Sequence, residues 1–532
     1  MTSLTGGPGG TNLSRRQVLG YVGLAAAGVA GMGGLAGCGG DSGSGGDSGS
    51  GGDASSGGQQ SGGVLTHGAT GGSGKDTIDP HVPVTNPDIA RVNNLYEPLL
   101  FWDDDYKLAP ALAESVEPSK DGRTWTVTLR EGVTFHNGKA VTGEDVLFSI
   151  RRVADPKAPK PAGGQLSQIL DFDAMKASGN TVTLPLNQPY AILDQLLAEY
   201  TLGIVPTDFD VSKPVGTGPF SYDSFTPGQS STFQKFANYW GTAPFVDTLV
   251  IQDFSDDNAK VNALLAGQVQ TIDNLPTNLI DSVKAQGGMA LESNSGAWVP
   301  FTMRVDTAPF DDVRVRQALR LIVDRQQMID QTLSGFGELG NDLYAPFDAA
   351  YAGKDFPQRQ QDIEQAKSLL KAAGRDGLQV ELFTGDDIGS VAPAAASLFV
   401  QQAKLAGVDV KVTKKNPFYG DDYLSYPFAQ DFWNTRQYLP QVAVGSLPNG
   451  SYNETHFDNA PFKKLIAAAS RELDEAKRNT LLKDAQKIEY DEGGYIIWGF
   501  RRQIDGYSSK VQGVKPSRYL PLGSYKFQNV SV

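Results

Sequence analysis

The clearest pattern of apolar and polar positions lies in the stretch that begins at Thr124. Residues Thr124–Leu129 alternate between threonine and a large apolar side chain, which is the two-residue period of a half-buried strand. Arg130–Gly132 then supplies turn residues, and Val133–Phe135 resumes the alternation. The pattern therefore predicts a β-hairpin.

A helix is predicted directly after this hairpin. Asn137 and Gly138 turn the chain, and Thr142 with Asp145 three residues later forms a capping box with Asp in the usual place of Glu. Val141 and Val146 stand where a hydrophobic staple belongs. Local signals agree at each step, so we expect a capped helix from Thr142.

Helices and strands alternate along much of the remaining chain, which predicts an α/β protein. The expected helices lie within 257–267, from Asp312 onward, at 362–374 and 394–407, and as a pair within 459–492 with Asp474 capping the second. The expected strands lie at 269–272, 378–383, 408–412 and, as one buried strand, 495–500.

Composition narrows the class of protein. The 532 residues are 40% hydrophobic and 20% charged, which is an ordinary globular composition for about three domain-sized units. The net charge of −14 argues against a nucleic-acid partner, because phosphate binding needs a basic face. Four scattered histidines and the absence of common catalytic motifs indicate neither a metal site nor an enzyme. We expect no cofactor.

The first 37 residues are predicted to be an export signal. Ser14–Leu19 (SRRQVL) resembles the twin-arginine motif and precedes a weakly apolar, glycine-rich run from Tyr21 to Leu35. That run is short for a membrane span of ~20 residues. A general secretory signal with an incidental Arg-Arg pair is the alternative.

The single cysteine, Cys38, ends the sequence Leu35-Ala36-Gly37-Cys38, which resembles a lipobox. We expect Cys38 to carry a lipid that anchors the protein to the outer face of a membrane. With one cysteine, no disulfide can form within the chain. Residues 38–63 are rich in Gly, Ser and Asp and predict a flexible tether between the lipid and a folded body.

Several ordered motifs give the folded body a family resemblance. They are Tyr96–Leu100 (YEPLL), the long run Leu108–Val146, Val215–Phe220 (VGTGPF), Asn238–Trp240 (NYW) and Pro309–Leu319 (PFDDVRVRQAL). Together they resemble the extracellular solute-binding proteins of family 5, the capture subunits of dipeptide, oligopeptide and nickel ABC importers. The resemblance covers about residues 77–525.

The resemblance implies an α/β fold of two lobes, like other periplasmic binding proteins, with a subdomain inserted in the first lobe. The lobes would close on ligand like a hinge. The predicted bounds are a signal at 1–37, a tether at 38–63, lobe I at 64–109, 208–302 and 499–532, its inserted subdomain at 110–207, and lobe II at 303–498.

The family's cleft motif, approximately W-x-x-D-x-x-x-P, corresponds here to Trp433–Pro440. The resemblance implies that the motif's Asp grips the free amine of a peptide, but this chain has Arg436 at that position. A cation cannot pair with an ammonium group. Arg436 is therefore expected to bind an anionic ligand group, to pair internally beside a neutral ligand, or to lie on an exposed loop.

Further candidate ligand contacts follow from the same resemblance. Asp431 is a substitute acid close to Trp433, and Trp433 itself is either a platform for ligand or a core residue. Trp498 and Phe500 lie on the strand expected to line the cleft, and Asp79 and His81 lie near the start of lobe I.

The function expected is capture of a small molecule or peptide and its delivery to the permease subunits of an ABC importer. The protein would be a monomer outside the cell, held at the membrane by lipid on Cys38, or periplasmic in a Gram-negative cell. A secreted hydrolase and a surface sensor or adhesin are the rival classes. The sequence leaves the ligand open among peptides, sugars, opines and metal chelates.

Overall fold

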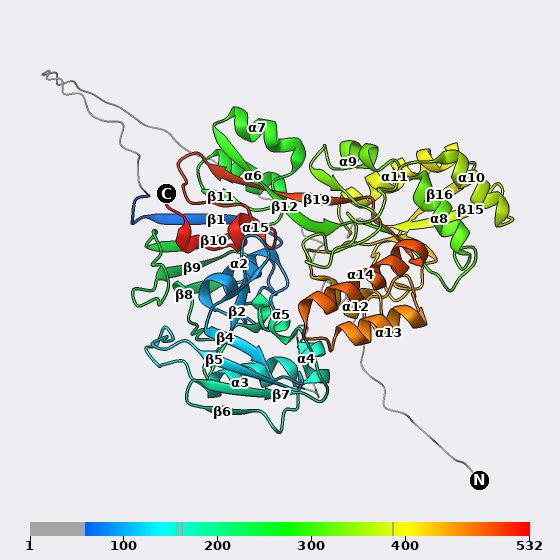
Figure 1. The fold of residues 1–532 in the computed structure, drawn as a ribbon. Coiled ribbons are helices and arrows are strands. Elements are labelled where there is room, and N and C mark those ends of the chain that lie inside the picture. Colours follow the sequence, from blue (N-terminus) through cyan, green and yellow to red (C-terminus); the bar gives the residue numbers. More distant parts are fainter. Residues whose placement is uncertain (1–58, 156, 158, 161–162, 386–387) are drawn as a thin grey trace, which may run out of the picture.

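The computed structural model describes residues 59–155, 157, 159–160, 163–385 and 388–532. The predicted export signal, Cys38 and the tether as far as residue 58 lie outside these ranges. The described elements form two lobes that lie side by side (Figure 1). In the described part of the chain, every helix is too short or too polar to cross a bilayer.

A large sheet organises the first lobe. Its strand order is β12-β19-β11-β1-β10-β9-β8, and β14 also pairs with β19. The strands are β1 (Val64–Thr70), β8 (Phe220–Thr226), β9 (Ser230–Lys235), β10 (Thr248–Phe254), β11 (Thr271–Ile272), β12 (Gly288–Trp298), β14 (Gly337–Leu339) and β19 (Gly499–Ser508). The helical elements on this lobe are α2 (Asn86–Leu95), α6 (Asp257–Leu265), η2 (Thr277–Leu279), α7 (Ile280–Ala285), α15 (Pro521–Ser524) and η4 (Phe527–Asn529).

A smaller sheet forms the core of the second lobe, in the order β16-β15-β17-β13-β18. Its strands are β13 (Phe301–Met303), β15 (Gln379–Thr384), β16 (Asp409–Lys414), β17 (Phe428–Gln430) and β18 (Tyr495–Ile496). The helices of this lobe are α8 (Val313–Ile322), α9 (Arg325–Thr332), α10 (Ile363–Ala372), α11 (Val391–Leu405), α12 (Tyr438–Gly445), α13 (Ala460–Ala469) and α14 (Glu475–Glu492). The predicted Asp474 cap of α14 is confirmed, because its carboxylate accepts from Lys477 N.

A third unit is built on a four-stranded sheet, β4-β5-β7-β6. Its elements are β4 (Ala113–Pro118), β5 (Thr124–Leu129), α3 (Gly143–Ala154), α4 (Gly163–Ile169), β6 (Lys176–Ser178), β7 (Thr181–Pro185), α5 (Leu193–Leu197) and η1 (Tyr200–Leu202), preceded by the ribbon of β2 (Leu100–Trp102) and β3 (Leu108–Pro110). This unit lies below the large sheet in Figure 1.

The capped helix predicted after the hairpin is present as α3. The Asp145 carboxylate accepts from Thr142 N at 2.9 Å, and Val146 is fully buried. The prediction that Thr124–Leu129 and Val133–Phe135 form a hairpin is wrong. β5 pairs with β4 and β7, whereas Val133–Phe135 forms only an isolated bridge between Thr134 and Ala140. One edge of β5 is taken by β4, which directly precedes it, and the other by β7, so Val133–Phe135 had no free edge to pair with.

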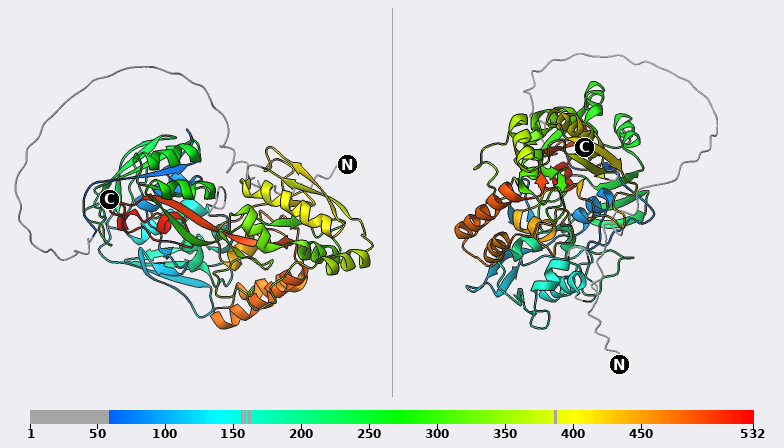
Figure 2. Two further views of the ribbon diagram at one scale, coloured as in Figure 1. Left: turned by 90° about the horizontal axis from the view of Figure 1, so that it is seen from above. Right: turned by 90° about the vertical axis from the view of Figure 1, so that its right-hand side faces the viewer.

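The chain crosses between the lobes twice, in neighbouring strands. β12 ends at Trp298 in the large sheet and β13 begins at Phe301 in the small one. On the way back, β18 ends at Ile496 and β19 begins at Gly499. Seen from above, β19 runs from one lobe toward the other (Figure 2, left). The single buried strand predicted at 495–500 is therefore wrong, because its two halves belong to different sheets.

These crossings lie close to the predicted divisions at 302/303 and 498/499. The bounds of the lobes and of the inserted subdomain stay predictions, since a division into domains depends on how the parts move. Strand pairs that connect two lobes are the usual place for a hinge.

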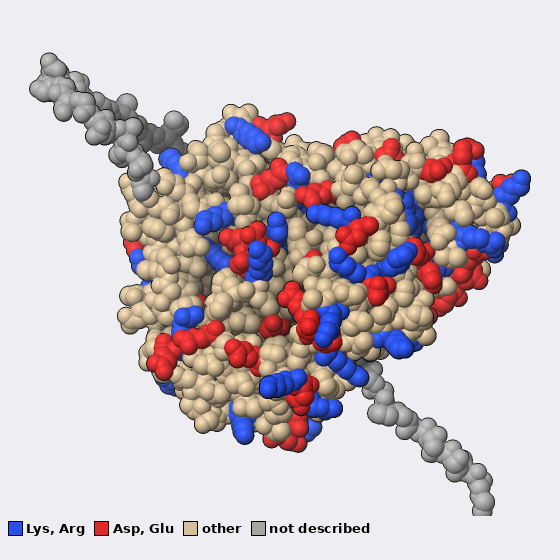
Figure 3. Space-filling view, in the orientation of Figure 1, with Lys and Arg blue, Asp and Glu red and all other residues tan. Residues whose placement is uncertain are grey.

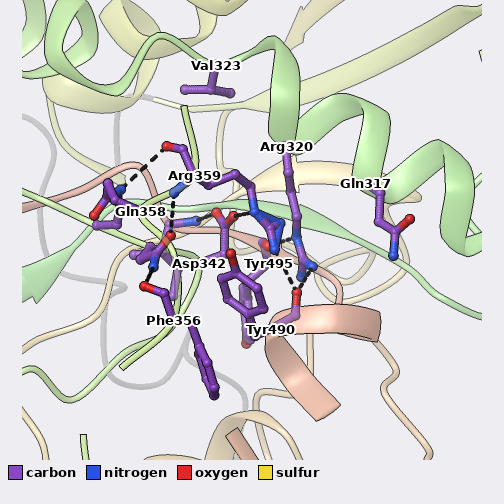
Figure 4. A network of polar contacts seen from close by, with 12 residues as sticks. Gln317, Arg320, Val323, Asp342, Phe356, Gln358, Arg359, Tyr490 and Tyr495 are labelled. Carbon is purple, nitrogen blue, oxygen red and sulfur yellow. Dashed lines mark hydrogen bonds and ion pairs between the residues drawn. The ribbon is translucent and has the colours of Figure 1, made fainter. Parts of the chain in front are cut away.

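A buried ion network holds the return crossing in the second lobe (Figure 4). Asp342 accepts two hydrogen bonds from Arg325, at 2.9 and 2.8 Å, and one from Ile497 N at 3.0 Å. Arg359 lies 3.3 Å from the same carboxylate. Burial would raise the pKa of Asp342, but Arg325 and its neighbouring arginines outweigh it and hold that pKa below its usual range. The network thus ties Ile497 to the helices of the second lobe.

Candidate functional site

Trp433 lies beside the outgoing crossing strand. Its backbone exchanges two hydrogen bonds of 2.9 Å with Trp298. The two indole rings stack with centroids 6.0 Å apart, and the stack continues through Tyr344 to Tyr438 at 5.6 and 5.2 Å. Only 3% of Trp433 is exposed. The ring is thus held mainly by core contacts, and its role as a ligand platform stays a prediction.

Arg436 lies on the loop between Trp433 and α12 and is half-buried. Its guanidinium carbon lies 5.7 Å from the centroid of the Trp433 ring, and one nitrogen donates a long hydrogen bond of 3.4 Å to Gln441. Among the residues that the structure describes, no carboxylate comes within ion-pair distance of Arg436. A planar group with five donors therefore has most of its hydrogen-bonding capacity unused.

An acid of the third unit lies within electrostatic reach of Arg436. Glu199, just before η1, accepts a hydrogen bond of 2.9 Å from the Tyr519 hydroxyl. Burial raises the pKa of Glu199, and Arg436 is the strongest of the groups that oppose this rise. The two charges are thus close enough to interact but not in contact. A cation and an anion that are near each other but unpaired are a suitable pair for a ligand that carries both charges.

An aromatic cluster surrounds Glu199. Trp102 stacks on Tyr106 at 4.4 Å, and Tyr519 lies 5.4 Å from Tyr106 and 6.3 Å from Tyr200. Trp102 and Tyr106 are each 3% exposed, whereas Tyr519 and Tyr200 are half-buried. The cluster combines flat apolar surface with several hydroxyl groups, which suits a small polar solute.

Asp431 lies deep in the second lobe, with 0% exposure. Its carboxylate accepts from the hydroxyls of Tyr419 at 2.7 Å and Tyr423 at 2.5 Å. Trp498 is 1% exposed and belongs to the core of the second lobe, and Phe500 is 3% exposed and pairs with Trp298 across β12 and β19. Ligand contact by these three residues stays a prediction.

Asp79 and His81 meet each other at a different place, through α3. The guanidinium of Arg152 donates to Asp79 at 2.6 and 2.8 Å and approaches the His81 ring at 2.6 Å. The other ring nitrogen of His81 lies 2.8 Å from the carbonyl of Gly203. Burial lowers the pKa of His81 to about 4, so the ring is neutral at pH 7. Both side chains are thus engaged by contacts with α3 and with the segment after η1.

Of the predicted site residues, the structure brings together Trp433 with Arg436 and, at a separate place, Asp79 with His81. Sequence reasoning missed Glu199 and the aromatic residues of its cluster, which are Tyr519, Tyr106 and Trp102. They lie between 83 and 334 residues from Arg436 in the sequence, and none carries a local motif. Trp102, Tyr106 and Tyr519 share aromatic character, which is more often typical of a core, and Glu199 gave no signal of its own.

Elsewhere, an open surface pocket of about 650 Å³ lies over β4 and β5. Arg130 covers the ring of Trp240 at 4.5 Å, and the Trp240 N–H donates to Glu97 at 2.8 Å. None of the residues lining this pocket belongs to the Arg436 site. Over the face seen in Figure 3, acidic and basic side chains are interspersed rather than gathered into one charged patch.

The chain is similar to known proteins over most of its length. The model of the family "bacterial extracellular solute-binding proteins, family 5 Middle" matches residues 107–476. A dipeptide-binding protein of Escherichia coli K12 is 27% identical over 468 residues, covering 80% of this chain and 86% of that protein. The glutathione-binding protein GsiB of Shigella flexneri serotype 5b is 25% identical, with 83% and 90% covered.

A solved structure also shares the fold. It is the periplasmic binding protein DppA of Helicobacter pylori in complex with the peptide STSA, at 23% identity and a TM-score of 0.72. The match covers 89% of this chain and 98% of that one. The expected two-lobed α/β fold of periplasmic binding proteins is thereby confirmed.

Proposed function

The chain belongs to family 5 of the bacterial extracellular solute-binding proteins, and we propose that it captures a small polar solute outside the cell and delivers it to an ABC importer. Membership of a solute-binding family confirms the expectation that the chain is not an enzyme. The delivery partner would be the permease subunits, which recognise the closed, liganded form.

The observation that carries a more specific proposal is the pair of facing charges at Arg436 and Glu199. A ligand carboxylate would bind Arg436, which has a fork of donors to offer, and a ligand ammonium would bind Glu199. Dipeptides and glutathione, the ligands in the names of two relatives, each carry both kinds of group. Where the family motif has Asp, the amine of the peptide binds at this position. Here the carboxylate of the ligand would bind at Arg436, so the ligand would lie in the reverse orientation.

Closure of the lobes would complete this site. Arg436 belongs to the second lobe, while Glu199 and Tyr519 belong to the other side of the crossing strands. Neither wall alone presents both charges. Binding of a doubly charged solute would therefore favour the closed arrangement, by its differential affinity for the two states.

The first test is a thermal-shift panel of five compounds: Ala-Ala, N-acetyl-Ala-Ala, Ala-Ala amide, glucuronate and maltose. We expect Ala-Ala to raise the melting temperature most, by several degrees at saturation, because only it satisfies both charges. Compounds with a carboxylate alone should give smaller shifts. Stabilisation by Ala-Ala amide without stabilisation by N-acetyl-Ala-Ala would contradict an anion site at Arg436.

We also propose that Cys38 carries a diacylglycerol anchor after twin-arginine export, so that the protein is held at the outer face of the membrane. Two acyl chains suffice for stable attachment. The variant Cys38→Ala is expected to move the protein from the membrane pellet to the supernatant in cell fractionation. Ser42→Ala, a change in the tether, is the matched control and should remain in the pellet. Retention of Cys38→Ala in the pellet would refute the lipid anchor.

A further inference from the structure

The C-terminal segment contains a turn of left-handed helix. Leu522, Gly523, Ser524 and Tyr525 have φ of 51°, 66°, 61° and 56° in succession. Ser524 N donates to Leu520 O at 3.2 Å and Tyr525 N to Pro521 O at 2.9 Å, so the turn has hydrogen bonds of helical spacing. Three of the four residues are not glycine, and each is strained in this conformation because its Cβ crowds the following carbonyl oxygen. Such strain persists only where the surroundings enforce it.

Asp505 on β19 holds the start of this turn. Its carboxylate accepts from Leu522 N at 2.9 Å, Asn274 N at 3.1 Å and the Gln503 amide at 2.7 Å. Asp505 is 0% exposed. All three partners are donors, so only an ionised carboxylate satisfies them together. An amide in its place would turn its own N–H toward one of these donors.

The end of the turn is held independently. The Tyr525 hydroxyl donates to Asp273 at 2.7 Å, and the Asn94 amide donates to Tyr525 O at 2.9 Å. Tyr525 is 0% exposed. The turn is thus clamped at both ends against the large sheet and α2.

The residues before the turn lead directly to the candidate ligand site. Ser517 N donates to the Ser293 hydroxyl of β12 at 3.2 Å, and the Ser517 hydroxyl lies 2.9 Å from that of Ser524. Tyr519 N donates to the Ser517 hydroxyl at 3.1 Å, and the Tyr519 hydroxyl donates to Glu199 at 2.9 Å. A continuous chain of contacts therefore runs from the strained turn to Glu199.

We propose that Asp505 is a positioning residue, which holds the left-handed turn and thereby sets the place of Tyr519 and Glu199 in the ligand site. The proposal rests on the proposed function for the meaning of that site. Asp505 lies on β19 and Ser293 on β12, which are the two strands that cross between the lobes. The contacts that position Tyr519 and Glu199 thus also connect these residues to the strands that would bend during closure.

The test uses Asp505→Asn in the full chain at pH 8, above the pKa of Asp505, which burial raises to about 7. Amide hydrogen exchange of the ligand-free protein is the primary measurement. We expect faster exchange in 515–527 and also in 196–202, the segment that contains Glu199. The Kd for Ala-Ala should increase about tenfold, as for the loss of one buried hydrogen bond.

A second variant separates positioning from general loss of stability. Gly523 has a φ of 66°, where any other residue is strained. Gly523→Ala therefore disturbs the same turn while it leaves the side chains of Asp505, Ser517 and Ser524 in place, and we expect faster exchange in 196–202 in this variant as well. Val283→Ala is the matched control, because it opens a cavity in α7 of the same lobe. This variant should lower the melting temperature without changing exchange in 196–202.

The proposal is overturned if Asp505→Asn changes only the melting temperature, or if Gly523→Ala leaves exchange in 196–202 unchanged. If the wild-type protein binds none of the five panel compounds, the proposed function fails, while exchange in 196–202 still decides whether Asp505 positions Glu199. The two failures are therefore distinguishable.

Discussion

Reversing the charge at position 436, with Arg436→Asp, is expected to weaken binding of Ala-Ala by about 100-fold or more. The variant places a second acid opposite Glu199, so the carboxylate of the ligand meets repulsion where it had a donor fork. Unpaired charge in a partly buried site costs far more than the loss of one neutral contact. Isothermal titration calorimetry of the full chain measures the effect directly.

Two controls make this result specific. Arg436→Lys keeps the charge but loses the planar fork, and we expect an intermediate loss of affinity. Arg375→Asp makes the same change of net charge at an exposed position after α10 and should leave the Kd unchanged. If Arg436→Asp and the wild type bind Ala-Ala equally well, the ligand's carboxylate binds elsewhere. If Arg436→Asp binds Ala-Ala amide more tightly than the wild type does, position 436 contacts the ligand's amine.

The second large effect concerns stability rather than binding. Asp342→Ala is expected to lower the free energy of unfolding by about 3–5 kcal/mol. The change leaves Arg325 and Arg359 without their buried counter-charge and leaves Ile497 N without an acceptor. Chemical denaturation of the wild type and the variant, followed by circular dichroism, gives the difference.

A surface ion pair in the same lobe provides the comparison. Asp491 pairs with Lys487 at 2.7 Å, and about half of each side chain is exposed. Asp491→Ala should cost at most about 0.5 kcal/mol, because water screens the pair. If Asp342→Ala costs no more than Asp491→Ala, the network of Figure 4 does not hold the crossing strand.

Local elements of the fold could be predicted because their causes are local. The cap formed by Thr142 and Asp145 lies within four residues of chain, and the apolar stripe of α8 repeats at helical spacing, so both helices were recognisable. Where a strand had to choose partners, the prediction was wrong. Val133–Phe135 looked like the second half of a hairpin, and 495–500 looked like one strand.

By itself, the sequence determined the α/β class, the capped helices and, through its ordered motifs, the family. It also determined that position 436 is a cation where an acid is expected. Only the tertiary structure decided which sheet each strand joins, that Asp342 holds Ile497 at the return crossing, and that Asp505 on β19 holds Leu522. It also decided that Glu199 bonds to Tyr519 and lies within electrostatic reach of Arg436. The physical reason is distance along the chain: helix caps and periodicity act over a few residues, whereas strand pairing and facing charges join segments hundreds of residues apart.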